Sequence, residues 1–458
     1  MSPQTTPILL AGQRVTVVGA GRSGLAASRL LSRAGFIVFL TEIGQLSSEA
    51  GHVLRAARVG FEVGGHTARA LETDFVVTSP GVPSSSPLLR QAMESGIPVY
   101  SEIEAAFWFC RSPVVAITGS NGKTTTTALI GHIFRSSGRK TWVAGNIGHP
   151  FSDVVEKAGS KDLIILEISS FQLDYIDLFR PDVSVLLNIT PDHLDRYGNS
   201  IDAYAGSKFR IAENQKNNDA LVYNMDDYRI SSWAGRMHSE DGPTRYGFTL
   251  KENDRASGFI LDDSLILRTD AHEEVLMKMD ELALPGRHNV YNSLAAAVAA
   301  RVKEVRSDIV SESLASFEGV PHRLEFVREV DCVQYVNDSK ATNVNALWYA
   351  LQSFSCPIVL IAGGRDKGND YESLKPLVSE RVRVLIAIGE SARVIDEALG
   401  PCVDQLVAAD SMADAVRYAS LLAREGEAVL LSPACASFDM FRNYEERGDA
   451  FKQLVSNL

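Results

Sequence analysis

The sequence predicts an α/β protein built from three domains. Short runs of apolar and β-branched residues alternate with helical patterns from one end of the chain to the other, and this alternation is typical of parallel sheets with helices packed on them. The chain has 458 residues, too many for one ordinary core, because domains average about 150 residues. Glycine-rich loops follow two of the apolar runs and lead into helical patterns, so we expect two phosphate-binding turns.

Composition and charge exclude several classes of protein. Hydrophobic residues make up 45% and charged residues 22% of the chain, a balance typical of globular proteins. The formal net charge of −12 argues against a protein that coats nucleic acid, since such binding depends on many basic side chains. Backbone N–H groups can still bind phosphate in an acidic protein. We therefore expect small anionic partners and no nucleic acid.

The cysteines and the apolar segments indicate the compartment. The five cysteines are scattered and form no CxxC pair, which favours a reducing environment. Residues 1–13 lack the basic start, long apolar stretch and cleavage site of a signal peptide. No segment offers the roughly 18 uninterrupted apolar residues that a membrane span needs. We predict a cytoplasmic protein with no membrane span.

The first domain opens with a strand–loop–helix–strand unit. We expect a strand at 14–18, the loop Gly19-Ala20-Gly21-Arg22-Ser23-Gly24, a helix to about residue 34 and a strand at 36–41. The GxGxxG spacing predicts a Rossmann-like domain whose helix N-terminus faces a phosphate. Glu42 follows Gly24 by 18 residues, where a ribose partner of a dinucleotide belongs. The same loop is compatible with another phosphate-bearing ligand, or with close packing of helix and strand alone.

A second domain begins near residue 110 with a stronger phosphate-binding signal. The strand Val114–Ile117 enters Thr118-Gly119-Ser120-Asn121-Gly122-Lys123-Thr124-Thr125, and a helix follows. Lys123 is placed to reach the β- and γ-phosphates, and the Thr124 hydroxyl to ligate the nucleotide's Mg²⁺. The usual GxxxxGK[ST] pattern has glycine where this chain has Ile117. A plain glycine turn is the weaker interpretation, and the loop alone permits an ATPase, a kinase, a motor or a ligase.

Polar residues at the ends of two further strands belong to the same rim. Glu167 follows the strand 163–166, where a carboxylate meets the nucleotide's metal ion, although an ordinary strand-end acid fits equally well. Asp192-His193 follows the strand 183–187, and a lone histidine is as often structural as a ligand. Helices are expected at 201–213 and 289–302, and irregular β structure with several turns at 235–280.

The last third of the chain alternates again and forms the third domain. A boundary falls at 319–321, and strands are expected at 333–336, 358–362, 382–388 and 428–431. We predict a Rossmann-like N-terminal domain at 1–110, a central phosphate-loop ATPase domain with a mostly parallel sheet at 111–320, and a second Rossmann-like domain at 321–458.

Several ordered motifs identify a family. The central segments resemble those of the Mur ligases and, in the shared central domain, of the folylpolyglutamate synthetases. These segments are the loop Thr118–Thr125, Gly145-Asn146-Ile147-Gly148, Glu167, Pro191-Asp192-His193 and Gly286-Arg287-His288-Asn289. They set the reaction class more than the substrate.

Three longer stretches resemble the D-glutamate-adding branch of the Mur ligases. They are Glu167-Ile168-Ser169-Ser170-Phe171-Gln172-Leu173, Asn337-Asp338-Ser339-Lys340-Ala341-Thr342-Asn343, and Ser432–Phe438 with Asn443-Tyr444-Glu445-Glu446-Arg447-Gly448. The resemblance implies an ATP-dependent acid–amino-acid ligase. It would join D-glutamate to UDP-N-acetylmuramoyl-L-alanine through an acyl phosphate, in the peptidoglycan precursor synthesis that serves cell shape and division. The chain would act as a monomer.

The resemblance also assigns catalytic and metal-binding positions. Lys123 and metal ions would neutralise the repulsion between the triphosphate and the attacking carboxylate. Lys208 stands at the position of the lysine that the family carbamylates, and a carbamate supplies the oxygen ligands that Mg²⁺ prefers. Two Mg²⁺ sites are therefore expected. The catalytic positions are Lys123, Glu167, His193, Lys208 and Lys340, and the metal ligands are Thr124, Glu167, His193 and carbamylated Lys208.

Substrate-binding positions come from all three predicted domains, so the site is expected to assemble when the domains close. The ATP positions are Gly119, Ser120, Asn121, Gly122, Lys123, Thr124, Thr125, Asn289, Asn292, Arg323 and Asp338. The UDP-substrate positions are Gly21, Arg22, Ser23, Gly24, Ser79, Asn146 and His193. The D-glutamate positions are Thr342, Lys367, Ser437, Phe438 and Tyr444, the last where the family often has phenylalanine.

Three alternatives stay open at this point. A sibling Mur ligase or a folylpolyglutamate synthetase would share Lys123, Glu167, His193 and Lys208, and only the motifs of the third domain argue against it. An NAD-dependent oxidoreductase draws support from the GxGxxG loop and Glu42 but leaves the second phosphate loop unexplained. A nucleotide-gated scaffold without catalysis is disfavoured because the catalytic positions are retained together.

Overall fold

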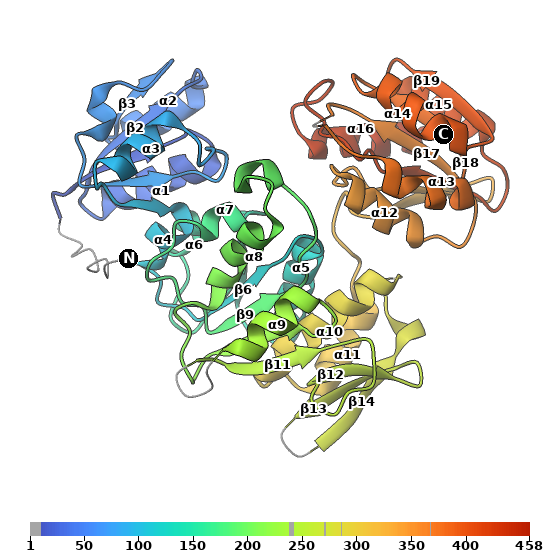
Figure 1. Cartoon of the computed structure of the whole chain (residues 1–458), viewed down its shortest axis with the longest axis horizontal. Helices are drawn as coiled ribbons and strands as arrows, with labels where there is room; N and C mark the ends of the chain where they lie inside the picture. The colour runs from blue at the N-terminus through green and yellow to red at the C-terminus, as the bar shows by residue number, and fades with distance from the viewer. Residues whose placement is uncertain (1–10, 238–241, 270–271, 285, 367) are drawn as a thin grey trace. The chain divides into compact units, whose positions relative to one another are not determined.

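The computed structural model describes residues 11–237, 242–269, 272–284, 286–366 and 368–458 (Figure 1). The chain divides into two compact units. The first comprises Met1–Leu282 with Tyr291–Ser316, and the second Ala283–Val290 with Phe317–Leu458. Three separate sheets supply the framework, two in the first unit and one in the second. The α/β class is confirmed.

The N-terminal sheet has five parallel strands in the order β3-β2-β1-β4-β5. The order reverses direction between β1 and β4, and ligands of doubly wound sheets bind outside the strand ends at such a point. This is the predicted Rossmann-like domain. Its elements are β1 Arg14–Val18, α1 Arg22–Arg33, β2 Ile37–Glu42, α2 Ser48–Ala56, β3 Gly60–Val63, the 3-10 turn Ala68–Leu71, β4 Phe75–Thr78, α3 Pro87–Glu94, β5 Val99–Ser101 and α4 Glu102–Phe107.

The central sheet has nine strands in the order β14-β13-β12-β11-β10-β9-β6-β8-β7. The strands β7, β8, β6, β9, β10 and β11 run parallel, so their carboxyl ends lie on one edge, as predicted. The elements up to β10 are β6 Val114–Thr118, α5 Lys123–Ser136, β7 Thr141–Gly145, α6 Phe151–Val154, β8 Leu163–Glu167, α7 Ser170–Leu173, β9 Val183–Leu186, the 3-10 turns Leu194–Tyr197 and Arg210–Ala212, α8 Ile201–Phe209 and β10 Ala220–Asn224.

The segment expected to be irregular is more regular than predicted. It forms an antiparallel meander, β12-β13-β14, that extends the sheet beyond β11. Turn residues between short apolar runs concealed this regularity, and one register shift interrupts the β13–β14 pairing at Leu265/Ile266. The remaining elements are α9 Tyr228–Arg236, β11 Thr244–Phe248, β12 Gly258–Leu261, β13 Ser264–Thr269, β14 His272–Lys278, the 3-10 turn Met279–Glu281, α10 Arg287–Val302 and α11 Ser307–Ser316.

The C-terminal sheet has six strands in the order β15-β16-β20-β17-β18-β19. All neighbours pair in parallel except β15 and β16. Buried clusters lie on both faces of this sheet. Its elements are β15 Glu325–Val330, β16 Val333–Asn337, α12 Val344–Gln352, β17 Ile358–Gly363, the 3-10 turns Glu372–Leu374 and Gly400–Cys402, α13 Lys375–Arg381, β18 Val382–Ile388, α14 Ala392–Leu399, β19 Gln405–Ala409, α15 Met412–Leu422, β20 Ala428–Leu431 and α16 Tyr444–Ser456.

Within the described residues, none of the helices combines the length and apolar character that a membrane crossing requires. The domain boundaries at 110 and 320 stay predictions.

Candidate active site

The loop between β6 and α5 has the backbone shape of a phosphate-binding turn. Gly119 and Gly122 have φ angles of +156° and +82°, which L side chains rarely adopt. A Cβ on Gly122 would lie 2.3 Å from Oδ1 of Asn292, so the predicted ATP residue on α10 packs directly on the loop. Thr126 Oγ1 donates to the same Asn292 oxygen at 3.2 Å.

The departure from the usual motif has a structural explanation. Ile117 is a fully buried residue of β6, paired in register with Glu167 of β8 and Val185 of β9. The position is therefore part of the central sheet, and the loop that can approach a phosphate begins at Gly119.

Asn188 holds this loop from the neighbouring strand end. Its carbonyl oxygen accepts from the Ser120 N–H at 2.9 Å, and its side-chain oxygen accepts from the Asn121 N–H at 2.8 Å. Its side-chain nitrogen donates to the Asn121 carbonyl at 3.0 Å. Asn188 was not among the residues predicted for the site, because no local sequence pattern marks its long-range pairing with the loop.

Two lysines converge on one carbonyl of the loop. Lys123 Nζ donates to the carbonyl oxygens of Gly119 and Ser120, at 2.9 Å and 2.8 Å. Lys208 Nζ, from α8, donates to the same Gly119 oxygen at 2.9 Å. The structure therefore brings two of the predicted catalytic residues to one point.

Lys208 is not a solvated helix residue. It is 1% exposed, and its ammonium lies 4.6 Å from the ring centre of Tyr204. Burial lowers the pKa of Lys208 well below its usual range, helped by the charge of Lys123 and opposed by three carboxylates that include Glu167. A lowered pKa favours the unprotonated amine, which is the form that acts as a nucleophile.

Glu167 ends β8 and is almost fully buried. Its Oε1 accepts from the Asn146 side chain at 2.9 Å, and its carbonyl accepts from the Asn146 N–H at 2.8 Å. Gly145 makes this approach possible, because a Cβ there would lie 2.3 Å from the Glu167 carbonyl oxygen. Thr124 is buried at the start of α5.

His193 follows β9 in the left-handed region, with φ of +52°. Its ring centre lies 5.2 Å from that of Phe171, and Nε2 lies 3.7 Å from Asp192 Oδ1. The Arg196 guanidinium lies over the Phe171 ring, with its central carbon 4.1 Å from the ring centre. Arg196 also donates to the Pro80 carbonyl at 3.3 Å, which links this turn to the N-terminal sheet.

No group of three or more His, Cys, Asp or Glu side chains within the described ranges is arranged to hold a metal ion. The predicted ligand set is of another kind, since it combines a hydroxyl, one carboxylate, one imidazole and a carbamate. Oxygen donors of this type suit Mg²⁺, which keeps several of its waters. The buried Lys208 amine fits such a set only after it gains oxygens.

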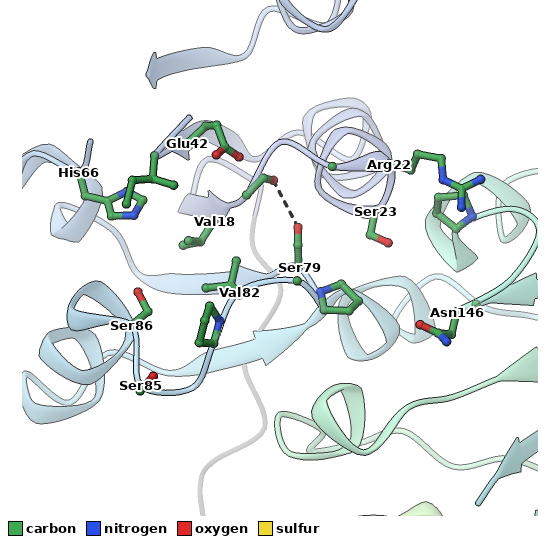
Figure 2. A pocket seen from close by; sticks show the side chains of 18 of the residues that line it. Val18, Arg22, Ser23, Glu42, His66, Ser79, Val82, Ser85, Ser86 and Asn146 are labelled. Atoms are coloured by element: carbon green, nitrogen blue, oxygen red, sulfur yellow. Dashed lines mark hydrogen bonds between the residues drawn. The ribbon is translucent and has the colours of Figure 1, made fainter. Parts of the chain in front are cut away.

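A pocket of about 700 Å³ lies at the switch point of the N-terminal sheet. Figure 2 shows its walls, where Ser79 Oγ donates to the Gly19 carbonyl at 3.3 Å. Five predicted UDP-substrate residues line it, namely Gly21, Arg22, Ser23, Ser79 and Asn146. Asn146 thus joins this pocket to Glu167.

Two other predicted residues are placed differently. Gly24 is not among the lining residues. A Cβ on it would lie 1.9 Å from the Gly19 carbonyl oxygen, so Gly24 permits close packing of α1 on the loop. His193 also lies outside the lining set. Glu42 lines the pocket, and its carboxylate accepts from the N–H groups of Ala20 and Gly44 at 2.6 Å and 2.8 Å.

In the C-terminal unit, Asp338 follows β16 in a fully buried position. Oδ2 accepts from Ser432 Oγ at 2.8 Å and Oδ1 from the Leu324 N–H at 3.2 Å. Burial raises the pKa of Asp338 to about 6, against the lowering effect of Arg323 and these hydrogen bonds.

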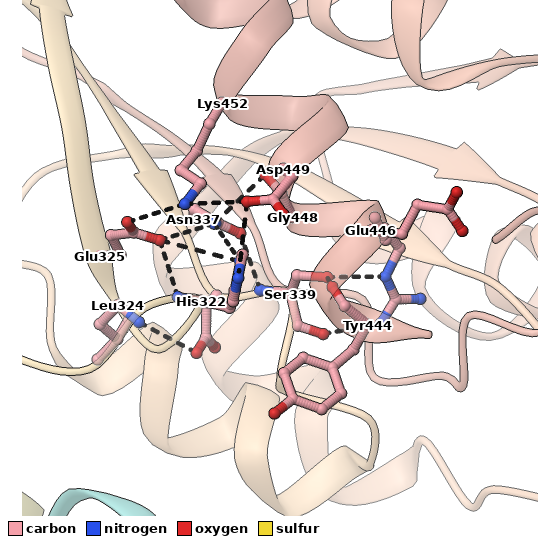
Figure 3. A network of polar contacts seen from close by, with 12 residues as sticks. His322, Leu324, Glu325, Asn337, Ser339, Tyr444, Glu446, Gly448, Asp449 and Lys452 are labelled. Carbon is pink, nitrogen blue, oxygen red and sulfur yellow. Dashed lines mark hydrogen bonds and ion pairs between the residues drawn. The ribbon is translucent and has the colours of Figure 1, made fainter. Parts of the chain in front are cut away.

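A polar network ties the predicted ligand residues of this unit together (Figure 3). Asn337 Nδ2 lies 3.1 Å from His322 Nδ1 and donates to Glu325 Oε2 at 2.9 Å. The His322 carbonyl accepts from the Lys340 N–H at 3.0 Å, and Lys340 Nζ lies 5.3 Å from the ring centre of Tyr444. The network fixes the turn that carries Asp338 and Lys340 against the start of α16.

The remaining predicted residues of this unit are placed as follows. The Thr342 N–H donates to the Lys340 carbonyl at 2.9 Å. Ser437 is buried and Phe438 is 60% exposed. The Asn289 N–H donates to the Gly286 carbonyl at 2.9 Å, and Lys367 lies outside the described residues.

Arg447 holds the two ends of this site in place. Its guanidinium, 3% exposed, donates to Ser339 Oγ and to the Ser339 and Cys435 carbonyls at 2.8–3.1 Å. It joins the turn after β16 to the loop after β20, and burial lowers its pKa to about 10. Although Arg447 stood in a recognised motif, its sequence position gave no role.

Three family models match this chain, one in each of its three predicted domains. The Mur ligase MurD-like N-terminal domain matches residues 13–101, the Mur ligase middle domain 117–300, and the Mur ligase glutamate ligase domain 322–435. The predicted three-domain organisation agrees with these matches.

Two relatives that match this chain over nearly its full length have the same name. The UDP-N-acetylmuramoylalanine–D-glutamate ligase of Salinibacter ruber is 55% identical over 458 residues, covering 99% of this chain and 100% of the relative. The enzyme of the same name from Pelotomaculum thermopropionicum is 47% identical over 450 residues, covering 97% and 98%.

Solved structures share the fold at low identity. The UDP-N-acetylmuramate–alanine ligase MurC of Thermotoga maritima has a TM-score of 0.60 at 18% identity, covering 97% of this chain and 99% of that one. FolC of E. coli, solved with DHPP and ADP, has a TM-score of 0.59 at 17% identity, covering 83% and 99%. The chain therefore belongs to the Mur ligase family, in the group of UDP-N-acetylmuramoylalanine–D-glutamate ligases.

Proposed function

We propose that this chain uses ATP to join D-glutamate to UDP-N-acetylmuramoyl-L-alanine. The products are UDP-N-acetylmuramoyl-L-alanyl-D-glutamate, ADP and phosphate, and the reaction belongs to peptidoglycan precursor synthesis. One observation carries the proposal. Asn146 lines the 700 Å³ pocket and also donates to Glu167 beside the phosphate loop, so a nucleotide sugar in that pocket extends toward bound ATP. We place the reaction in the cytoplasm and assign it to a monomer.

The reaction needs two steps because an amine cannot displace the oxygen of a carboxylate at a useful rate. A carboxylate oxygen of the substrate first attacks the γ-phosphorus of ATP, and the bond to the ADP oxygen breaks. The amine of D-glutamate then attacks the acyl carbon, loses a proton, and phosphate leaves. Lys123, held over the loop, lowers the repulsion between the two anions in the first step.

Mg²⁺ would supply positive charge that neutralises the phosphate oxygens. Thr124 and Glu167 would hold one ion, and His193 with carbamylated Lys208 would hold a second. Carbamylation fits Lys208 because burial lowers the pKa of its amine and so favours the unprotonated form that can attack CO₂. The amine nitrogen attacks CO₂, forms the N–C bond and releases one proton, which leaves an oxygen-bearing anion.

The predicted ATP and D-glutamate positions include residues of the C-terminal unit. Asp338 and Arg323 of this unit would bind ATP, as would Asn289 and Asn292 of α10, and Lys340 is assigned to the transferred phosphate. Thr342, Lys367, Ser437, Phe438 and Tyr444 would bind D-glutamate, whose two carboxylates suit a cation and hydroxyl donors. We retain 1–110, 111–320 and 321–458 as the functional division of the chain.

The test is phosphate release by the purified protein with Mg-ATP and UDP-N-acetylmuramoyl-L-alanine. D-Glutamate is compared with L-glutamate, L-alanine, glycine and meso-diaminopimelate. We expect release that depends on D-glutamate and on the UDP substrate together. Release with another amino acid would retain the ligase chemistry and overturn the assigned substrate. No release with any of them would overturn the proposed reaction.

A further inference from the structure

The ends of the 700 Å³ pocket differ in chemistry. Gly21 and Ser23, at the N-terminus of α1, line the pocket, and the backbone N–H groups at this helix end favour a diphosphate. Asn146 lies at one end and His66 at the other in Figure 2. Since the acyl end of the substrate must reach the phosphate loop beyond Asn146, the nucleoside occupies the end that carries His66.

His66 is held in one orientation by a chain of polar contacts beneath the pocket. Its Nδ1 lies 2.7 Å from the Thr41 hydroxyl oxygen, and that hydroxyl donates to Glu62 Oε1 at 2.7 Å. Thr67 adds its N–H and hydroxyl to the Glu62 carboxylate at 3.0 Å and 2.6 Å. Thr41 is fully buried at the end of β2, so the anchor is part of the sheet.

This arrangement selects one imidazole tautomer. Burial would raise the pKa of Glu62, but the hydrogen bonds from Thr67 and Thr41 outweigh it and keep the pKa below its usual range. An ionised carboxylate only accepts, so it takes the single proton of the Thr41 hydroxyl. The hydroxyl oxygen must then accept from His66, which places the ring proton on Nδ1. In the neutral ring, Nε2 is left as an acceptor.

Nε2 has no hydrogen-bond partner among the described residues, and the side chain lines the pocket. The second ionisable group at this end, Glu42, already accepts from the N–H groups of Ala20 and Gly44. Glu42 and Nε2 of His66 are both acceptors, so the polar requirement at this end of the pocket is for a ligand N–H, and the imidazole lone pair is the acceptor that has no partner among the described residues.

We propose that His66 reads the nucleobase, with Nε2 accepting the N3–H of uracil. This inference rests on the proposed function, since it names how the same UDP pocket chooses its base. Cytosine has a lone pair at N3, which would face the lone pair of Nε2. An unmatched acceptor in a pocket costs affinity, so His66 excludes cytidine nucleotides and leaves the diphosphate contacts unchanged.

The experiment measures dissociation constants of UDP and CDP by calorimetry at pH 8.5, above the range in which imidazole ordinarily titrates. The proteins are the wild type, His66→Phe, His66→Gln and the control His52→Phe. His52 is exposed on α2 and does not line the pocket. ATP binding by each variant reports whether the fold and the phosphate loop are intact.

We expect the wild type and His52→Phe to prefer UDP over CDP by about tenfold or more. His66→Phe should lose this preference by weakening UDP binding, and His66→Gln should regain part of it, because an amide can present its carbonyl. If His66→Phe binds ATP normally and keeps the full preference for UDP, the base-reading role is overturned and the proposed function stands. Failure of the wild type to bind UDP would overturn both.

Discussion

At the scale of single residues, the centre of the site is the Gly119 carbonyl oxygen, which accepts from both Lys123 and Lys208. The two side chains have different chemistry in spite of this shared partner. Lys123 stands at the start of α5, where a phosphate would meet it, and Lys208 is enclosed on α8. We therefore assign charge neutralisation to Lys123 and carbamate formation to Lys208.

Lys123→Ala should reduce turnover about 10³-fold, because it removes a preorganised charge from the γ-phosphate. The comparison is Lys161→Ala, which removes an exposed lysine. Both are assayed by ADP formation under saturating substrates. Activity of Lys123→Ala within threefold of the wild type would contradict the assigned role.

Lys208 should carry a carbamate in the active protein. Equilibration with ¹³C-labelled bicarbonate is expected to produce a carbamate carbon signal in NMR spectra of the wild type, and Lys208→Arg should lack both the signal and activity. Lys157→Arg, at an exposed position, is the control and should keep both. A labelled signal that survives in Lys208→Arg would place the modification elsewhere.

The charged form of the buried Asp338 carboxylate lowers the free energy of unfolding, and we assign this residue to ATP binding. Burial raises the pKa of Asp338 to about 6 in the folded state. At pH values between the ordinary pKa of an aspartate and about 6, the folded state therefore binds more protons than the unfolded state. Stability then falls as pH rises through this window, by about 3 kcal/mol at most above it. Asp338→Asn should therefore raise the thermal midpoint at pH 7.5 and weaken ATP binding.

The control for this trade-off is Asp410→Asn, which changes an exposed carboxylate. Thermal midpoints are measured at pH 4 and pH 7.5, and the gain of Asp338→Asn should be confined to the higher pH. An equal effect at both pH values would show that the charge of Asp338 is not the cause.

At the scale of secondary-structure elements, prediction succeeded where the pattern is local. The strands β1, β18 and β20 have the predicted bounds, and the loop from Gly119 to Thr125 follows a strand and opens a helix as expected. The prediction gave no strand for β3, β4, β5, β7, β10, β15 or β19. Of these, β3 and β5 have only four and three residues with partial exposure, which give no clear alternation. The meander β12–β14 was obscured by its turns.

The same limit applies to the site residues. Lys123 and Glu167 are marked by their places at strand ends, which a sequence displays. Asn188 and His66 act through partners distant in the sequence, and the contacts exist only once the strands pair. Gly24 was assigned to the UDP substrate by the family resemblance; in the structure it packs against the Gly19 carbonyl, which is the alternative that the loop pattern had left open.

The short helix α4 fastens the N-terminal sheet to the central domain. The Glu104 carboxylate accepts from the N–H groups of Asp177, Leu178 and Phe179 at 2.9–3.0 Å and from Trp108 Nε1 at 2.8 Å. Glu104→Gln should lower the free energy of unfolding by about 2 kcal/mol or more, because an amide NH₂ would face backbone donors. Urea denaturation checks this, with exposed Glu94→Gln as the control. Equal urea midpoints for Glu104→Gln and Glu94→Gln would contradict this stabilising role of Glu104.

At the scale of the whole molecule, each of the three described sheets carries one candidate subsite. The pocket that we assign to the nucleotide sugar lies at the N-terminal sheet, the phosphate loop with its two lysines at the central sheet, and the turn that carries Asp338 and Lys340 at the C-terminal sheet. Each candidate subsite lies at the carboxyl ends of parallel strands, where open α/β sheets bind ligands. The family motifs recognised in the sequence fall at these edges.

The central claim is that the chain activates a carboxylate as an acyl phosphate before D-glutamate attacks. The most direct test supplies UDP-N-acetylmuramoyl-L-alanine with ¹⁸O in its carboxylate and analyses the released phosphate by mass spectrometry. The account predicts one ¹⁸O atom in each released phosphate, because the carboxylate oxygen that attacks ATP leaves with the phosphate. Labelled phosphate should be released only when D-glutamate is present. Unlabelled phosphate released alongside the amide product would contradict it.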